Sequence, residues 1–428
     1  MDRPVDTSSL EERPLEERTA HVTAREAIAL LGVRLPTLYA YVSRGWVRSI
    51  PGPRRRGRLY ARADLDRLKA RHDARAGHAA VAVDALRWGE PVLDSAITRI
   101  DREGTFYRGH SVSDLAKADV PFESVAELLW RGDMAAERAR PSWRADGFGR
   151  ASSRIATALR QSGAGDPLLR LMLAIPVFAS ADSDRAASTD LECARARTLL
   201  VRLRSLPGIE DRARRDRALA APTMARGVLE AFGARKGRDQ ERAVNRCLVV
   251  CADHELNAST FAARVAASAG CTLYACIGAA LAVLSGSLHG GVTDQVAALV
   301  EGIGSPDRAR AFVTERSRLG ERIPGFGHRL YPDGDPRAEV LLALAHANSR
   351  RDVRVATLLA IIDAMRAVGR EPPNLDAGLV AVAFTLGLPA GAASVLFALG
   401  RTVGWVAHVL EQRSSPYVIR PRARYVGL

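Results

Sequence analysis

Apolar residues along most of the chain recur with the spacing of helices. Beyond residue 85 the segments are long, rich in Ala and Leu, and helical in period, and few positions alternate between apolar and polar as strands do. No internal repeat with a period of roughly 20–50 residues is apparent there. This pattern predicts an almost entirely α-helical domain over residues 85–428, too large for a simple four-helix bundle.

Residues 20–75 carry a second pattern, which predicts a small separate domain. Thr23 and Glu26 have the spacing of a capping box, and Gly32 suits the end of the helix that they begin. Pro36 suits the first residue of a second helix, because its fixed φ fits that position and its missing N–H is not needed there. The spacing therefore predicts two short helices joined by a tight turn.

Charge is unevenly distributed, and the densest positive charge lies in this small domain. The chain has a net charge of +14. Residues 1–19 carry three Arg against six acidic residues and predict a flexible acidic N-terminus. Residues 20–75 carry thirteen Arg and Lys against four acidic residues, a net +9, with four Arg between Pro53 and Arg58. A short basic segment of this kind is typical of a nucleic-acid contact.

The two helices are followed by a basic hairpin over residues 50–60 and a third helix over residues 63–71. This order resembles the winged helix-turn-helix of excisionase-type DNA-binding domains, which implies that the second helix enters the major groove of double-stranded DNA and that the hairpin follows phosphate. The residues then expected to contact DNA are Arg34, Thr37, Arg44, Arg54, Arg55, Arg56 and Arg58. The alternative is a helical dimerisation or docking module with a solvated basic loop. Residues 76–84, rich in Ala, predict a linker.

Composition adds limits on the class of protein. With 47% hydrophobic and 26% charged residues the chain is typical of a globular protein, and no signal peptide is seen, so we expect a cytoplasmic location. Five cysteines on apolar helical patterns indicate core packing rather than disulfides or a metal site. The uncharged stretch from Ala377 to Gly400 has the length of a membrane span, but Gly387, Leu388 and Pro389 interrupt it and favour two buried helices.

Four segments place His, Asp and Arg beside small residues in otherwise apolar surroundings. They are Ala252–Thr260, Ser287–Gly291, Pro324–Arg329 and Asp335–Ala338. Glycine lets a backbone approach a ligand closely, which favours a binding site over a set of core histidines. The three histidines lack the short helical spacing of zinc ligands and no cysteine accompanies them, so we expect no metal.

These segments, together with Pro373–Asp376 and the basic segment Ile419–Gly427, resemble the citrate synthase family from about Trp88 to the C-terminus. The added helix-turn-helix is similar to a bacterial subgroup of that family. The resemblance implies condensation of an acyl-CoA with oxaloacetate and release of CoA, with acetyl-CoA or propionyl-CoA as the acyl donor. It implies no cofactor besides the CoA thioester substrate.

The resemblance also implies a role for each site residue. Asp376 would be the base that removes the methyl proton, His289 would donate to the thioester oxygen, and His328 would polarise the oxaloacetate carbonyl. The expected substrate-binding residues are His254, Arg337, Arg401 and Arg420, the last reaching the site of the neighbouring subunit. The expected CoA-binding residues are Gly325, Phe326, Gly327 and Arg329.

The family fold implies a large and a smaller, mobile helical part, the smaller over about residues 295–388, in a homodimer or a larger oligomer of dimers. One departure concerns CoA, because Pro332 stands where the family commonly has a basic residue. The alternative function is a DNA-binding regulator that uses the domain as a metabolite sensor. Asp376 discriminates between the two, because binding oxaloacetate requires no methyl-abstracting base.

Overall fold

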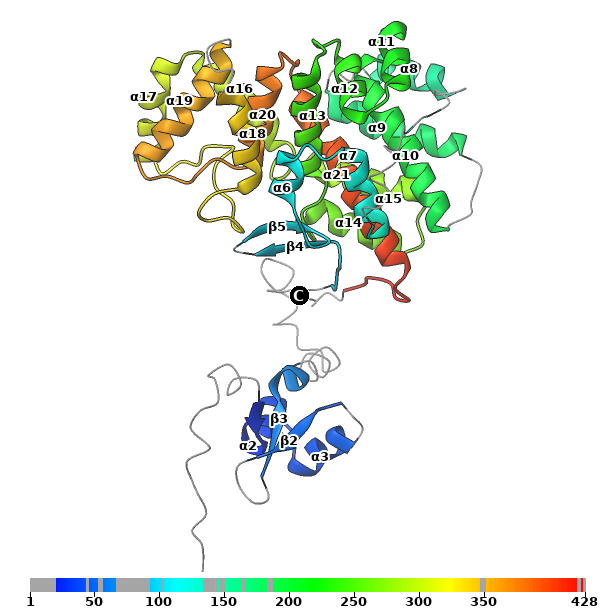
Figure 1. Cartoon of the computed structure of the whole chain (residues 1–428), viewed down its shortest axis with the longest axis vertical. Helices are drawn as coiled ribbons and strands as arrows, with labels where there is room; N and C mark the ends of the chain where they lie inside the picture. Colours follow the sequence, from blue (N-terminus) through cyan, green and yellow to red (C-terminus); the bar gives the residue numbers. More distant parts are fainter. Residues whose placement is uncertain are drawn as a thin grey trace, which may run out of the picture. The chain divides into compact units, whose positions relative to one another are not determined.

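The computed structural model describes residues 21–43, 46–52, 57–66, 93–101, 103–133, 143, 145, 151–162, 166–182, 188–346, 352–421 and 425. The chain divides into two compact units, one of Met1–Asp94 with Ala423–Leu428 and the other of Ser95–Arg422. Both are drawn in Figure 1, and each is described by itself. The predicted acidic N-terminus and the predicted linker lie outside the described residues.

The first unit contains a three-stranded antiparallel sheet and helices, and the predicted third helix is helical over residues 62–66, the part of it that lies within the described residues. Its elements are β1 (His21–Thr23), α2 (Ala24–Leu31), α3 (Leu35–Ser43), β2 (Ser49–Pro51) and β3 (Arg58–Ala61), with the strands in the order β1-β3-β2. The predicted capping box of Thr23 and Glu26 is confirmed, and Gly32 ends α2 in the left-handed conformation. Leu38 and Leu65 are fully buried in the small core of this unit.

The second unit begins with a small sheet that the apolar pattern did not predict. Its strands are β4 (Thr98–Asp101), β5 (Gly104–Tyr107) and β6 (His110–Ser111), paired antiparallel in sequence order. Strands of two to four residues are too short to produce a readable alternation.

The rest of the second unit is helical, as predicted. Its helices are α6 (Val112–Lys117), α7 (Phe122–Arg131), α8 (Ala151–Ser162), α9 (Pro167–Ala181), α10 (Thr189–Ser205), the 3₁₀ turn η3 (Leu206–Gly208), α11 (Arg212–Ala220), α12 (Met224–Phe232), α13 (Arg238–Cys251), α14 (Ala258–Ser268), α15 (Leu273–Leu284), α16 (Val292–Ile303), α17 (Pro306–Arg318), α18 (Pro336–His346), α19 (Val353–Ala367), α20 (Leu375–Thr385) and α21 (Ala392–Arg413).

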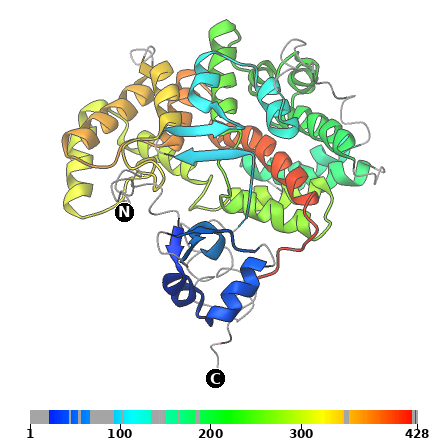
Figure 2. The ribbon, with the colours of Figure 1, turned by 60° about the horizontal axis from the view of Figure 1, so that its bottom comes forward.

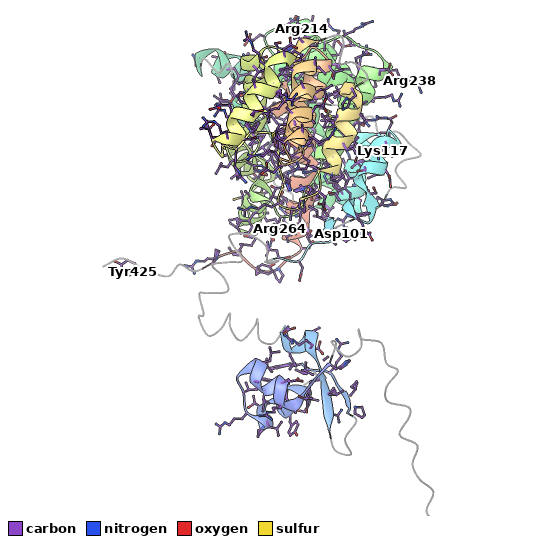
Figure 3. The ribbon with its side chains drawn as sticks, turned by 90° about the vertical axis from the view of Figure 1, so that its left-hand side faces the viewer. Asp101, Lys117, Arg214, Arg238, Arg264 and Tyr425 are labelled. Carbon is purple, nitrogen blue, oxygen red and sulfur yellow. The ribbon has the colours of Figure 1, made fainter. Side chains whose placement is uncertain are left out.

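Helix α21 is the central helix of this unit. Helices α16 to α20 gather on one side of it and α7 to α12 on the other (Figures 1 and 2). Seen from the side of α17 and α19, Asp101 in β4 and Arg264 in α14 lie at the opposite end of the unit from Arg214 in α11 (Figure 3). Among the described residues α21 alone is long and apolar enough to cross a membrane, but 94% of its apolar window is buried inside the protein, as in a core helix.

The predicted break in the uncharged stretch is confirmed. Helix α20 ends at Thr385 and α21 begins at Ala392, with Gly387 and Gly391 in the left-handed conformation between them. The break separates the two helices. As a result Asp376, at the start of α20, and Arg401, in the middle of α21, reach the same site.

Candidate active site

The motif residues His254, His328 and Arg337 meet around a tyrosine. The imidazole rings of His254 and His328 lie 5.2 Å apart edge to face. The Tyr331 ring lies 4.8 Å from the His328 ring, and the Arg337 guanidinium carbon lies 5.2 Å from the Tyr331 ring centre. These residues come from the α13–α14 loop, the α17–α18 loop and the first turn of α18, so tertiary packing assembles them.

The glycine-rich segment before His328 is hydrogen-bonded to the segment that precedes Asp376. The Asn374 backbone N–H donates to the Gly325 carbonyl oxygen (2.9 Å), and the Gly327 N–H donates to the Pro372 carbonyl oxygen (2.8 Å). The Asn374 side chain donates to the Gly327 carbonyl (3.1 Å) and accepts from the Asp376 N–H (3.0 Å) as the N-cap of α20. The position of the Asp376 backbone is therefore fixed against this loop.

Asp376 has the electrostatic properties of a base that works near neutral pH. Its side chain is partly buried, and its Oδ1 atom is inaccessible and has no hydrogen-bond partner among the described residues. Burial raises the pKa of Asp376 to about 7, although the charges of Arg337 and Arg401 oppose this effect. Such a carboxylate can accept a proton from a substrate at physiological pH.

His289, in the loop between α15 and α16, is neutral at physiological pH. Its Nε2 atom lies 2.9 Å from the Ser259 hydroxyl oxygen, and its ring contacts Phe397 edge to face at 6.0 Å. Burial lowers the pKa of His289 to about 4, and the charge of Arg401 contributes a smaller part of this shift. The Ser259 hydroxyl also donates to Asn257 Oδ1 (2.7 Å) and accepts from the Trp405 indole N–H (3.2 Å), so its position beside the imidazole is fixed.

His328 is also neutral, and its tautomer can be read from the backbone. The Leu330 N–H donates to Nδ1 of His328 at 3.2 Å. Burial, and then the charge of Arg337, lower the pKa of His328 to about 4. A neutral ring that accepts at Nδ1 carries its proton on Nε2, so His328 offers an Nε2–H donor to a ligand.

The two buried arginines of this site differ in their partners. Arg337 forms a bidentate ion pair with Asp335 (2.9 and 2.8 Å), and that carboxylate outweighs burial and raises the pKa of Arg337. Arg401 is 1% exposed and donates from Nε to the Cys251 carbonyl (2.8 Å), and it pairs with no carboxylate among the described residues. Burial lowers the pKa of Arg401. A buried guanidinium without an ion pair favours an anionic ligand.

This geometry agrees with the comparisons with known proteins. The model of the family described as "Citrate synthase, C-terminal domain" matches residues 85–422. The chain belongs to the citrate synthase family. It is 29% identical to "Citrate synthase 2" of Bacillus subtilis (strain 168) over 361 residues, covering 79% of this chain and 94% of that protein. It is 30% identical to the "2-methylcitrate synthase" of Mycobacterium tuberculosis (strain H37Rv) over 375 residues, covering 83% of this chain and 91% of that protein.

Solved structures give the same result. The chain matches the citrate synthase of Thermoplasma acidophilum with a TM-score of 0.69 and 26% identity, over 79% of this chain and 94% of that one. That structure is a ternary complex with carboxymethyl coenzyme A and oxaloacetate. The second unit therefore has the helical citrate synthase fold, and the chain is a citrate synthase-type enzyme.

Within this citrate synthase fold, one expected site residue lies apart from the others. Arg420 is exposed on the segment after α21, where the Ile419 N–H donates to the Ser268 hydroxyl (3.0 Å). No hydrogen bond or ion pair joins Arg420 to any residue that the structure describes. Of the expected CoA-binding residues, Gly325 is buried and Arg329 is exposed. Phe326 forms an isolated antiparallel β-bridge with Pro373.

Sequence reasoning missed the residues that support this site. Tyr331, Ser259, Asp335 and Asn374 all lie in or beside the quoted motifs, but single Ser, Asn or Tyr residues carry no spacing signal of their own. Asp335 was visible two positions before Arg337, and that spacing could have indicated an ion pair. The described residues contain no group of three or more His, Cys, Asp or Glu that could hold a metal ion.

Proposed function

We propose that this enzyme condenses an acyl-CoA, either acetyl-CoA or propionyl-CoA, with oxaloacetate and releases CoA. The observation that carries the proposal is the Asp376 carboxyl, with an unpartnered buried oxygen and a pKa of about 7, held beside two buried guanidinium groups. The names of the relatives and the ligands of the Thermoplasma complex support the same substrates. The proposal includes a homodimer, a cytoplasmic location and no cofactor.

Each step is assigned to one side chain. Asp376 removes a proton from the carbon next to the thioester carbonyl, and His289 donates a hydrogen bond to the thioester oxygen, on which negative charge develops. The resulting carbon nucleophile attacks the ketone carbon of oxaloacetate. His328 polarises that ketone through its Nε2–H and transfers this proton to the alkoxide as the C–C bond forms. The proton that Asp376 took from the thioester restores the balance, because it replaces the one that His328 gave up. Water then hydrolyses the thioester and CoA leaves.

The substrate carboxylates are the anions that balance the buried arginines. Arg401 lacks an ion pair, and Arg337 retains N–H groups on Nη1 that make no hydrogen bond to the described residues. We assign these two, with His254, to oxaloacetate, and Arg420 of one subunit to the site of its partner. Gly325, Phe326, Gly327 and Arg329 are assigned to CoA. Helices α16 to α20, which cover most of residues 295–388, are assigned to the smaller part that closes over both substrates.

The experiment is a thiol-release assay with oxaloacetate and a series of acyl-CoAs. Asp376→Ala is expected to lower kcat by about 10²–10⁴, the usual contribution of a positioned base, and to change oxaloacetate binding little. Asp363→Ala, an exposed carboxylate on α19, serves as the matched control and should keep wild-type kcat. Wild-type protein that binds oxaloacetate but releases no CoA from any short acyl-CoA contradicts the proposal.

The same assay decides between the two acyl donors. One methylene group changes transition-state binding by only about 1–3 kcal/mol, so both donors are expected to react. The ratio of their kcat/KM values then places the enzyme with the citrate synthases or with the 2-methylcitrate synthases.

We infer a second function, binding of double-stranded DNA, for the first unit. Helices α2 and α3 are joined by a three-residue turn and followed by the β2–β3 hairpin, whose loop begins with a hydrogen bond from the Gly52 N–H to the Gly57 carbonyl (2.8 Å). Arg34 and Arg58 are exposed, and Thr37 lies in the first turn of α3. The other expected contacts, Arg44, Arg54, Arg55 and Arg56, lie outside the described residues. This arrangement supports a winged helix-turn-helix.

DNA binding is tested with the full-length protein across a salt series, with and without oxaloacetate. Replacing Arg54, Arg55, Arg56 and Arg58 by Gln should weaken binding to all sequences and reduce its salt dependence, because phosphate contacts release counterions. The control replaces four exposed arginines of the second unit, Arg212, Arg308, Arg318 and Arg366. If a chain that starts at Ala85 binds DNA as strongly as the full-length protein, the docking-module alternative is favoured. Oxaloacetate-dependent binding without turnover favours the regulator.

A further inference from the structure

The Tyr331 hydroxyl is the middle member of a chain of hydrogen bonds that joins Thr105 to His254. The hydroxyl is hydrogen-bonded to the His254 Nε2 atom (2.9 Å) and to the Thr105 hydroxyl on β5. Tyr331 is 5% exposed, Thr105 4% and His254 7%, so this chain is shielded from bulk water. Every group in it therefore has to satisfy its hydrogen-bonding capacity locally.

Counting protons gives the direction of the chain. Each hydroxyl has one proton to donate, and the Thr105 hydroxyl has no hydrogen-bond partner other than Tyr331 among the described residues. If Tyr331 donated to Thr105, the Thr105 proton would be buried without an acceptor. If Thr105 donates to Tyr331 and Tyr331 donates to His254, both protons have acceptors. The second arrangement is favoured because an unsatisfied buried donor is costly.

This direction fixes the state of His254. Burial, and then the charge of Arg337, lower the pKa of His254 well below its usual range, so the ring is neutral and carries one proton. A ring that accepts at Nε2 carries that proton on Nδ1. Nδ1 makes no hydrogen bond to a described residue, and its N–H is thus available to a ligand oxygen.

We propose that Tyr331, supported by Thr105, is a positioning residue that holds neutral His254 with its proton on Nδ1 as a donor to an oxygen of the dicarboxylate substrate. The inference rests on the proposed function in naming oxaloacetate as that substrate. The opposite tautomer would present a lone pair to the same oxygen and repel it. The Tyr331 ring also packs against His328 and Arg337, so one side chain sets the geometry of three ligand contacts.

Two substitutions separate the hydroxyl from the ring. Tyr331→Phe removes the hydroxyl and keeps the ring against His328, and Thr105→Val removes the donor behind it while leaving Tyr331 in place. Tyr274→Phe is the matched control, because its buried hydroxyl is hydrogen-bonded to Asp182 (2.9 Å) and takes no part in the site. Thermal unfolding of each full-length variant shows whether it is folded.

The primary readout is the ¹⁵N NMR spectrum of histidine-labelled protein, with the His254 signals assigned from a His254→Gln variant. We expect a protonated Nδ1 in the wild type and in Tyr274→Phe, and a mixture of tautomers or a protonated Nε2 in Tyr331→Phe. The KM for oxaloacetate should rise about tenfold in Tyr331→Phe, the effect of losing one hydrogen bond to a charged group, while the KM for the acyl-CoA stays unchanged. Thr105→Val should change the His254 tautomer and the KM for oxaloacetate in the same direction as Tyr331→Phe, but by a smaller amount.

Two results would overturn the proposal. One is a wild-type His254 that carries its proton on Nε2. The other is a folded Tyr331→Phe variant in which the tautomer and the oxaloacetate KM both match the wild type. A failure of the proposed function is distinguishable, because it shows as a wild-type enzyme without CoA release, whereas the tautomer is measured in the absence of turnover.

Discussion

At the scale of single residues, Asp376 couples the chemistry of the site to the stability of the fold. Burial raises the pKa of its carboxyl to about 7, so the folded protein binds this proton more tightly than the unfolded chain does. Its ionisation therefore costs folding free energy, and stability is lost as the pH rises from the unfolded pKa, about 4, to the folded pKa. For the same reason kcat/KM should increase with pH through about 7 if Asp376 is the base.

Asp376→Asn is expected to be more stable than the wild type at pH 8. The amide has nearly the same shape but no charge to bury, so the difference in the free energy of unfolding should shrink toward zero as the pH falls to about 4. Denaturant unfolding at several pH values measures this difference. Asp363→Asn, at an exposed position, is the control and should show no such trend. A gain in stability that does not depend on pH would contradict the pKa shift.

Ser259 is expected to control His289 without touching the substrate. Its hydroxyl is the partner of His289 Nε2 (2.9 Å) and accepts from the Trp405 indole (3.2 Å). Ser259→Ala should lower kcat by about 10–100-fold, because the imidazole loses its orientation, and destabilise the fold by about 1–3 kcal/mol, because a buried indole N–H loses its acceptor. Steady-state kinetics and denaturant unfolding measure the two effects. Unchanged kcat in a destabilised variant would limit Ser259 to a structural role.

At the scale of elements, the loop before His328 depends on a close approach between two helices. Gly325 has a φ of +87°, and a Cβ atom there would lie 2.8 Å from Val296 Cγ2 on α16 and 3.4 Å from Ala377 Cβ on α20. Gly320, in the turn after α17, has a φ of +67° but no atom within 4 Å of such a Cβ. The two glycines share the backbone requirement but differ in the space available.

Gly325→Ala and Gly320→Ala are therefore a matched pair. Gly320→Ala should lose about 1–2 kcal/mol of stability, because an L-residue is strained at positive φ. Gly325→Ala should lose more, because its Cβ atom also meets Val296. Only Gly325→Ala should also lose kcat, by up to about 10²-fold, because displacement of the loop moves Asn374 and with it Asp376. Equal kcat values in the two folded variants would show that the loop does not set the position of the base.

At the scale of the whole molecule, Arg420 provides a test of whether each active site uses residues from two subunits. It is exposed and makes no ion pair with a described residue. The proposed function assigns it to the substrate site of the partner subunit. Mixing inactive Arg420→Ala with inactive Asp376→Ala protein should restore about a quarter of wild-type activity at full subunit exchange, since half of the dimers are mixed and each has one intact site. Activity assays with exchange verified by mass spectrometry test this. No recovery would place Arg420 in the site of its own subunit.

Local signals in the sequence determined much of the fold. The capping box of Thr23 and Glu26, the helix end at Gly32 and the break between α20 and α21 depend on residues within a few positions of each other, so their chemistry is readable without tertiary contacts. The ordered motifs around His254, His289 and His328 likewise identified the family. The short strands β4 to β6 were not predicted, because they are formed by pairing across turns and leave no periodic pattern in the sequence.

Only the tertiary structure decided how the site residues are charged and held. The pKa of Asp376 depends on its burial and on the charges of Arg337 and Arg401, and within the site the ion pair of Arg337 with Asp335 leaves Arg401 without a carboxylate partner. Tyr331 is joined to Thr105 across 226 positions of the chain. Burial, electrostatic coupling and such long-range hydrogen bonds arise from residues that are distant in sequence, and a sequence pattern contains only near neighbours.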